Sequence, residues 1–590
     1  MAKTRKNIIA ILVVLAIFIA GTCITMAAKS NNGTIEVKEL EFVTSETKTL
    51  VHGQLLIPEN ATAETPAPGV VLGHGGGDNL AQVLPLSYEF ARRGYVVLAF
   101  DGSGAGETDV SPATDMIVSG TDIFANAVEQ LINMDFVSPD IIVGGHSMGG
   151  WYSFNVANER NDGIIKLVLS VGMDAKSDSL VTNYAYILGK YDASGLNQAK
   201  NGIIRSIVDT ERYKTLFDTD EDIVVGKEYG SWADGTGRIY LLSNTGHTWE
   251  MYDSLTINYA LDIANRVVPN PNYIEPGNQT WGWVMVGEGM AFLSILAFVF
   301  FMASLLLKTA AFEKLALPVR KPVGFKTKSA PWFLCLALMT CISPVLYFVV
   351  TPFMRNNAPS WMHLNFSADG MVFWHWVMAA IYITMFLVFH FVYAKRHGGC
   401  LMTYGLATEA EENRINIKYV LCALLFAAVV FLSTYLLLTV FYNLTHHSIS
   451  FMKWKMGFIP NYKIGTFLLY FVLELPYLFT SGLASRSLNV NNGDRRKGAS
   501  MRRSVALSLA ISSIGLIVAD IVLTIVVTTS GKIIVPQVTF YTGLLSMLPW
   551  LAISGLVNCY LTNKTNSTYT GVFCATLISA WSLAGNFPIA

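Results

Sequence analysis

The stretch Gly145-His146-Ser147-Met148-Gly149 decides how the first half of this chain is interpreted. An apolar run, 141–143, precedes it, and a helix-like stretch, 151–159, follows it. A serine between glycines at a sharp strand-to-helix turn has a strained backbone, which exposes its hydroxyl at the top of the sheet. We therefore expect Ser147 to act as a nucleophile.

Short apolar runs alternate with helical patterns on both sides of this motif. Two runs predict an opening hairpin, at 35–43 and 50–57, and six more predict buried strands at 70–73, 95–100, 141–145, 165–171, 184–188 and 238–242. Helical patterns lie between several of them, at 80–93, 123–134 and 151–159. This alternation predicts a mostly parallel sheet with helices on both faces, and catalytic groups at the carboxyl ends of its strands.

With these elements around it, the serine motif resembles the α/β-hydrolase superfamily, nearest to its dienelactone-hydrolase-like and small esterase branches. The resemblance covers residues 35–268, somewhat under half of the chain. It implies an α/β-hydrolase fold, serine-hydrolase activity of the esterase type and a catalytic triad in the order serine, acid, histidine.

That order allows the base to be found by elimination. The histidines of this half are His52, His74, His146 and His247, and only His247 comes after the serine motif. It follows the last predicted strand, where the family carries its histidine. An imidazole there can take the proton of Ser147 and return it to the leaving group.

The acid of the triad has two candidates, each just beyond a predicted strand. Asp192 follows Gly189-Lys190-Tyr191, which resembles the family's strand ending in Gly-x-x-Asp, and Asp174 follows the strand at 165–171. Asp192 is the preferred assignment and Asp174 the runner-up. The acid would fix the tautomer of the imidazole and stabilise the imidazolium.

A glycine-rich segment, Gly73-His74-Gly75-Gly76-Gly77, follows the predicted strand at 70–73. It resembles the family's His-Gly loop, which supplies one backbone N–H to the oxyanion. Gly75 or Gly76 would be that donor, and the N–H of Met148 would be the second. His74 is expected to be structural.

Two other patterns favour structural interpretations. The glycine-rich turn at 100–107 lacks the third glycine of a dinucleotide-binding loop and comes late in the sheet. Asp218, Asp220 and Asp222 resemble the start of a calcium loop, but Ile223 occupies the position that requires glycine. We therefore expect a metal-independent mechanism without a cofactor. The short gap between the strands at 165–171 and 184–188 leaves no room for a large lid, so access to Ser147 is expected to be open.

The composition shows that part of the chain lies in lipid. Only 14% of the residues are charged and the mean hydropathy is +0.43, which is too apolar for a soluble protein of this length. Residues 1–28 are interpreted as an N-terminal transmembrane anchor, with a cleaved signal peptide as the alternative. An extracytoplasmic hydrolase domain at 29–270 and a linker at 271–283 follow. The remainder, 284–590, is a predicted membrane domain of about eight transmembrane helices, at 284–307, 330–353, 371–394, 419–441, 464–484, 505–528, 538–560 and 570–588.

The distribution of basic residues agrees with this topology. If the hydrolase domain is outside, the inward loops hold seventeen lysines and arginines and the outward loops only five, namely Arg355, Lys453, Lys455, Lys463 and Lys532. Such an excess is typical of cytoplasmic loops. The chain is therefore predicted to be a multi-pass protein of the cell membrane.

Cysteine usage and net charge argue against two classes of protein, disulfide scaffolds and nucleic-acid-binding proteins. All seven cysteines fall in or beside membrane segments, so the exported domain is not a disulfide scaffold. The net charge of −1 gives no reason to expect nucleic acid as a partner. The expected partners are an ester or acyl substrate, lipid or envelope esters among the candidates, and membrane lipid.

Ionisable residues inside the apolar spans are costly, so each is a functional candidate. Glu288, His375, His390, Glu474 and Asp520 are of this kind, and Glu474 and Asp520 lie deepest. Interhelical contacts are their structural alternative.

These features predict a membrane-bound extracytoplasmic serine hydrolase that cleaves carboxylic esters or related acyl bonds through an acyl-Ser147 intermediate. Two alternatives stay open. The helices could transport or sense a molecule, with the hydrolase fold as an accessory domain. The acyl-enzyme could instead be resolved by a membrane or envelope alcohol, which would make the protein an acyltransferase.

Overall fold

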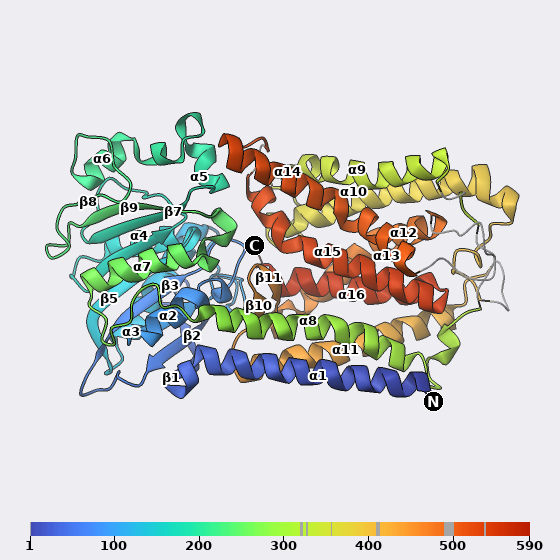
Figure 1. Ribbon diagram of the computed structural model, residues 1–590, viewed down its shortest axis with the longest axis horizontal. Coiled ribbons are helices and arrows are strands. Elements are labelled where there is room, and N and C mark those ends of the chain that lie inside the picture. Colours follow the sequence, from blue (N-terminus) through green and yellow to red (C-terminus); the bar gives the residue numbers. More distant parts are fainter. Residues whose placement is uncertain are drawn as a thin grey trace.

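A computed structural model of the chain describes residues 2–318, 323–325, 328–355, 357–408, 414–488, 501–535 and 538–589. A sheet covered by helices lies at one end and a bundle of long helices at the other (Figure 1). The fold class predicted from the sequence, an α/β-hydrolase sheet followed by an all-α region, is confirmed.

Nine strands form one sheet in the order β1-β2-β4-β3-β5-β6-β7-β9-β8. The strands are β1 (Ile35–Val43), β2 (Leu50–Pro58), β3 (Ala67–Gly73), β4 (Val96–Phe100), β5 (Val137–His146), β6 (Ile165–Val171), β7 (Asn183–Gly189), β8 (Glu228–Tyr229) and β9 (Arg238–Ser243). The six strands from β4 to β9 in this order are parallel, whereas β1, β2 and β8 pair antiparallel. The carboxyl ends of the six parallel strands therefore lie along one edge.

Helices cover both faces of the sheet. Successive side chains of a strand point to opposite faces, so each face contributes to its own apolar core. The helices are α2 (Leu84–Arg92), α3 (Met116–Ile132), α4 (Met148–Glu159), α5 (Ala193–Gln198), α6 (Glu211–Phe217) and α7 (Ser254–Val267). Val143 packs in a core with Phe124 of α3. Its neighbour Ile142 packs in a second core with Leu84 of α2 and Ile257 of α7.

The predicted linker is fixed to the hydrolase domain rather than free. The guanidinium of Arg93 donates to the carbonyls of Ile274, Glu275 and Asn278. Helix α8 (Trp281–Leu306) begins where the amide of Trp281 donates to the buried Glu89. The first turn of α8 is thus part of the hydrolase core.

The helical bundle is formed by α1 and the helices after the linker. They are α1 (Ala2–Lys29), α8, α9 (Ala330–Met354), α10 (Phe366–Phe389), α11 (Ile417–Thr445), α12 (Ile464–Leu488), α13 (Met501–Leu509), α14 (Gly515–Ser530), α15 (Val538–Thr565) and α16 (Thr568–Asn586). Within the described residues, eight helical stretches are long and apolar enough to cross a membrane, which indicates a multi-pass protein. Helix α1 packs along α8, where Gly21 and Gly287 allow close approach.

The last expected span, 570–588, forms α16, which is not among those eight stretches. Nearly all of its residues are buried, and it packs against α11, α12 and α15 at the centre of the bundle. Its many small and hydroxyl residues lower its hydropathy and suit close helix packing. The region after the linker therefore contributes seven of the eight candidate spans.

Between α11 and α12 the chain forms a small hairpin, β10 (Ile449–Phe451) and β11 (Trp454–Met456). The hairpin and the C-terminal end of the chain lie at the end of the bundle that faces the sheet, and the N-terminus lies at the opposite end (Figure 1). Of the basic residues in the predicted inward loops, Arg320, Lys321, Lys326, Arg495, Arg496 and Lys497 lie outside the described residues.

Candidate active site

Ser147 occupies the turn between β5 and α4. Its backbone has φ 52° and ψ −114°, a left-handed φ that a non-glycine residue adopts only under strain. Its amide donates to the carbonyl of Val171, at the end of β6 (2.8 Å). A Cβ at Gly145 or Gly149 would lie about 2 Å from the carbonyl oxygen of Gly73, so only glycine fits on either side of the turn.

His247 and Asp192 are hydrogen-bonded to each other, with 2.8 Å between His247 Nδ1 and Asp192 Oδ2. Asp192 follows β7 and is fully buried, and its Oδ1 accepts from the amide of Gly195 (2.9 Å). Because Nδ1 is bonded to the carboxylate, Nε2 is the nitrogen left for a proton from a serine.

Ser147 and His247 both lie at the end of β6. A Cβ at Gly172 would lie 3.1 Å from Cε1 of His247, while the amide of Ser147 is bonded to the preceding residue, Val171. The rings of His146 and His247 are 4.6 Å apart between centroids. The runner-up acid, Asp174, instead pairs with Lys176 (2.6 Å) and Arg212 (2.8 Å). Of the two candidate acids, only Asp192 contacts the imidazole.

The glycine loop after β3 lies against the serine. A Cβ at Gly75 would be 3.3 Å from Cβ of Ser147, but the N–H of Gly75 already donates to Gln82 Oε1 (2.7 Å). Gly76 is exposed and lies beside the side chain of Met148. Of the predicted oxyanion donors, the backbone N–H groups of Gly76 and Met148 therefore donate to no acceptor among the described residues.

His74 joins this loop to the glycine-rich turn after β4, which agrees with the structural role expected from the sequence. Its Nε2 accepts from the amide of Gly102 (2.8 Å), and its Nδ1 donates to the carbonyl of Gly75 (2.8 Å). Burial lowers the pKa of His74 and keeps it neutral, which suits one donor and one acceptor nitrogen.

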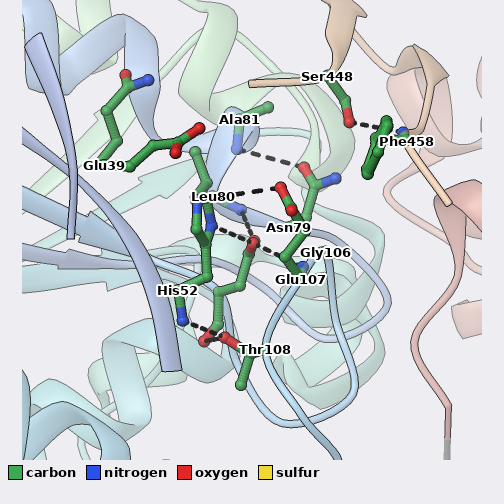
Figure 2. Close-up of polar contacts among 12 residues, drawn as sticks. Glu39, His52, Asn79, Leu80, Ala81, Gly106, Glu107, Thr108, Ser448 and Phe458 are labelled. Carbon is green, nitrogen blue, oxygen red and sulfur yellow. Dashed lines mark hydrogen bonds and ion pairs between the residues drawn. The ribbon is translucent and has the colours of Figure 1, made fainter. Parts of the chain in front are cut away.

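The turn after β4 is itself held by Asp101. This buried carboxylate accepts from the amide of Leu80 (2.7 Å) and pairs with His52 Nδ1 (3.3 Å). Burial alone would lower the pKa of His52, but the Asp101 carboxylate raises it to about 9. Figure 2 shows this polar cluster, in which the amide of His52 also donates to Thr108 (2.9 Å).

Glu250 is a buried carboxyl group of the site that the sequence analysis missed. Its Oε1 accepts from the amide of Gly189 (2.6 Å), and its Oε2 lies 3.0 Å from His146 Nε2 and 3.5 Å from His247 Nδ1. Burial and the nearby charge of Asp192 raise the pKa of Glu250 well above its usual range. Two carboxyl groups therefore flank one imidazole, and the raised pKa of Glu250 favours its protonated form.

The same cluster brings ligand atoms of His146, His247 and Glu250 within 4.8 Å of one another, which a metal ion could use. The hydrogen bonds above already account for His146 Nε2, Glu250 Oε2 and His247 Nδ1. Burial and the adjacent His247 lower the pKa of His146 well below its usual value, so it is a neutral donor. The arrangement is explained as a hydrogen-bond network that fixes the segment carrying His247.

The membrane half covers part of the loops at this edge of the sheet, in particular the turn after β4. Tyr462 donates to the carbonyl of Thr108 (2.8 Å), and the amide of Ile589 donates to the carbonyl of Gly104 (3.0 Å). The hydroxyl of Tyr462 also donates to the carbonyl of Gly106 (3.3 Å), and the hydroxyl of Tyr442 binds the carboxylate of Glu107. No large lid is inserted between β6 and β7, whereas the ends of the bundle contact the loops at this edge, and Ser147 is partly exposed.

Two lysines of the hairpin reach the glycine loop. Lys453 Nζ forms an ion pair with Asp78 Oδ2 (2.7 Å), and Lys455 pairs with the other oxygen of Asp78 and with Asn79 Oδ1 (3.2 Å). Burial lowers the pKa of both lysines to about 7. These residues were predicted only as cations of an outward loop.

The intramembrane candidates lie elsewhere. Glu474 binds His375 Nδ1 and Ser579 Oγ, both at 2.8 Å, and His375 stacks on Tyr477. Asp520 is buried, and its Oδ1 has no hydrogen-bond partner among the described residues.

The remaining two also have partners. Glu288 accepts from His447 Nε2 (2.7 Å) and the amide of Ser450 (2.8 Å), and thereby fixes the start of β10. His390 contacts the hydroxyl of Tyr404 (2.8 Å). None of these residues contacts the Ser147 site in the described part of the chain.

Comparison with known proteins agrees with the first half of the chain. Residues 64–197 match the Hydrolase_4 family, described as serine aminopeptidase, so the N-terminal part carries an α/β-hydrolase domain. No curated protein sequence matches the chain.

Solved structures similar to the chain cover this domain. They include a hypothetical protein from Pseudomonas aeruginosa (14% identity, 39% of this chain and 92% of that one, TM-score 0.28). An esterase from Pyrococcus furiosus is 15% identical (40% and 91%, TM-score 0.29). A thermophilic esterase from Thermogutta terrifontis is 13% identical (39% and 99%, TM-score 0.28).

Proposed function

We propose that this protein is a membrane-bound serine hydrolase that cleaves carboxylic esters or related acyl bonds. The observation that carries the proposal is the Asp192–His247 hydrogen bond beside the strained turn of Ser147. A serine, an imidazole and a buried carboxylate in this order are the parts that acyl transfer to a hydroxyl needs.

In the proposed reaction, His247 Nε2 takes the proton of Ser147 as the oxygen attacks the acyl carbon. Asp192 holds the tautomer through Nδ1 and stabilises the imidazolium. The amides of Gly76 and Met148 donate to the oxyanion of the tetrahedral intermediate. His247 then gives its proton to the leaving alcohol, and the bond to that alcohol breaks.

Water, activated by His247, resolves the acyl-Ser147 intermediate and releases the acid. An acceptor alcohol in place of water would give acyl transfer by the same steps. The cover formed by the membrane half makes lipid and envelope esters the favoured substrates, because they can approach along the bundle.

An ester is favoured over a peptide with a free amino terminus, although the matching family is described as an aminopeptidase. Such a peptide carries an ammonium group, which needs a carboxylate partner near the scissile bond. The membrane half instead brings Lys453 and Lys455 to the glycine loop. Cations at this position disfavour a cationic substrate.

The hydrolase domain is proposed to lie on the extracytoplasmic side of the cell membrane. The N-terminus and the hydrolase domain are at opposite ends of the bundle (Figure 1), and the loops rich in lysine and arginine follow spans that end away from the sheet. The start of the chain is also basic, with Lys3, Arg5 and Lys6, which likewise favours a cytoplasmic N-terminus.

An ester panel on the full chain in detergent tests this function. The wild type should hydrolyse 4-nitrophenyl acyl esters, and Ser147→Ala should reduce kcat/KM to background. Ser179→Ala removes an exposed serine of the same domain and should behave as the wild type. Equal rates for Ser147→Ala and the wild type would exclude the proposed nucleophile.

A second candidate is transport or sensing by the helices, which the buried network of Glu474, His375 and Ser579 favours. Under this alternative, Glu474→Gln would abolish flux or ligand binding while Ser147→Ala would leave it intact. Full function of a chain that ends before residue 284 would exclude it.

A further inference from the structure

The β10–β11 hairpin carries two ammonium groups into a protein interior. Lys453 is 9% exposed and Lys455 is 5% exposed. Lysine is almost never buried to this degree without partners, because its charge loses hydration. The hairpin is held in place by Glu288 through the amide of Ser450, so the two lysines are fixed against the glycine loop.

The charges of this cluster do not balance. Asp78 is the one carboxylate that forms an ion pair with either lysine in the described part of the chain. Each ammonium has three donors, yet Lys453 uses one of them, on Asp78, and Lys455 uses two, on Asp78 and Asn79. When both lysines are protonated, two cations and one anion leave an excess positive charge and unused N–H groups at a buried position.

A cavity borders the same residues. It is small, with about 20 Å³ of free volume, and partly open; it is lined on the hydrolase side by Gly77 and Asp78, and on the membrane side by both lysines, Met547 and Asn586. Gly77 is the neighbour of Gly76, whose amide is the proposed oxyanion donor. The cavity therefore borders the glycine loop at the residue that follows the proposed oxyanion donor.

We propose that this cavity is a subsite for an anionic group, a carboxylate or phosphate, carried by the ester substrate. The inference rests on the proposed function. Lys453 and Lys455 would donate to the anionic oxygens, whose charge would balance the cluster. Met547 of α15 and Phe587, which follows α16, give the opposite wall an apolar part, so the substrate class is an amphipathic ester with one anionic group.

Matched esters test the subsite on the full chain in detergent. Mono-4-nitrophenyl glutarate carries a carboxylate on the acyl part, 5-pentanoyloxy-2-nitrobenzoate carries one on the leaving group, and 4-nitrophenyl pentanoate is neutral. The wild type should prefer one of the anionic esters in kcat/KM by about tenfold or more, as expected for charge-assisted hydrogen bonds. The anionic ester that is preferred shows whether the acyl part or the leaving group of the substrate enters the cavity.

Lys455→Met is the informative variant, because it leaves the Lys453–Asp78 pair intact. It should lower the ratio of kcat/KM for the preferred anionic ester to that for the neutral ester by about tenfold, and Lys455→Arg should restore the ratio. Lys227→Met, at an exposed site on the far edge of the sheet, should keep the wild-type ratio. Equal ratios in the wild type and Lys455→Met would overturn the proposal.

A binding measurement separates this proposal from the proposed function. Inorganic phosphate should raise the apparent Tm of the wild type and of Ser147→Ala, and should raise that of Lys455→Met much less. If no ester is hydrolysed but the phosphate effect depends on Lys455, the hydrolase proposal fails and the subsite stands. If esters are hydrolysed without charge preference and phosphate has no Lys455-dependent effect, the subsite fails alone.

Discussion

Asp192 holds the Nδ1 side of His247 at 2.8 Å, and Asp174, the other aspartate at a strand end, is bound by Lys176 and Arg212 instead. The two residues are therefore a matched pair for testing the acid of the triad. The Asp192–His247 bond occupies Nδ1 and leaves Nε2 free, and no contact with His247 involves Asp174.

Asp192→Asn should lower kcat by about 10³- to 10⁴-fold, because an amide at this position favours the wrong tautomer. Asp174→Asn should stay within about threefold of the wild type, since it changes only an ion pair outside the site. Steady-state hydrolysis of a 4-nitrophenyl ester measures both. A larger loss of kcat for Asp174→Asn than for Asp192→Asn would show that Asp192 is not the acid of the triad.

The glycine loop gives a second pair. A Cβ at Gly75 would lie 2.8 Å from His146 Nδ1 and 3.3 Å from Cβ of Ser147, whereas one at Gly76 would meet only the flexible side chain of Met148 at 3.1 Å. Gly75→Ala should therefore reduce kcat/KM by about 10²-fold through displacement of the serine turn. Gly76→Ala keeps the backbone donor and should lose much less activity. The reverse order would contradict the assignment of this loop.

Glu250 should make stability depend on pH. Its pKa in the folded protein is raised above the unfolded value, so the folded state holds the proton more tightly. The resulting stability is present below the usual glutamate pKa and is lost as the pH rises toward the folded pKa. Wild-type Tm should fall over this range, and the curve of Glu250→Gln should be flatter. Parallel curves would mean that Glu250 is ionised in the folded state.

The anion subsite should weaken with rising pH. Burial lowers the pKa of Lys453 and Lys455 to about 7, and the charged or titratable groups around them are Asp78, His74, His146 and Glu250. Above that pH the ammonium groups lose their protons, while the carboxylate of the glutarate ester stays ionised. The ratio of kcat/KM for the anionic and neutral esters should fall from about pH 6 to about pH 8. A constant ratio would exclude the lysines as its source.

Membrane sidedness can be tested with single cysteines in intact cells. Ser179→Cys, exposed on the hydrolase domain, should react with a membrane-impermeant maleimide, and Lys314→Cys, exposed in the first predicted inward loop, should react only after permeabilisation. The protein without an added cysteine gives the background labelling of the native cysteines. Labelling of residue 314 alone in intact cells would place the hydrolase domain in the cytoplasm.

The positions of the candidate site residues could be predicted from the sequence because local rules determine them. A serine between glycines after an apolar run predicts the strained turn, and the triad order leaves His247 as the one eligible base. The choice between Asp192 and Asp174 needed the structure, because both follow strands and only tertiary contacts separate them.

Contacts that join distant segments could not be predicted in this way. Glu250 lies three residues after His247 like an ordinary surface acid, and only its burial against Asp192 shows its role. Lys453 and Lys455 have the pattern of outward-loop cations, yet they pair with Asp78, some 375 residues earlier in the chain. The contacts between the bundle and this edge of the sheet were missed for the same reason, since they come from another part of the chain.

Labelling with a fluorophosphonate probe tests the central claim most directly, because the probe reacts only with a serine activated by its neighbours. The full-length protein should gain one adduct, peptide mass spectrometry should locate it on Ser147, and His247→Ala should abolish it. An adduct on another serine, or undiminished labelling of Ser147→Ala, would contradict the proposed mechanism.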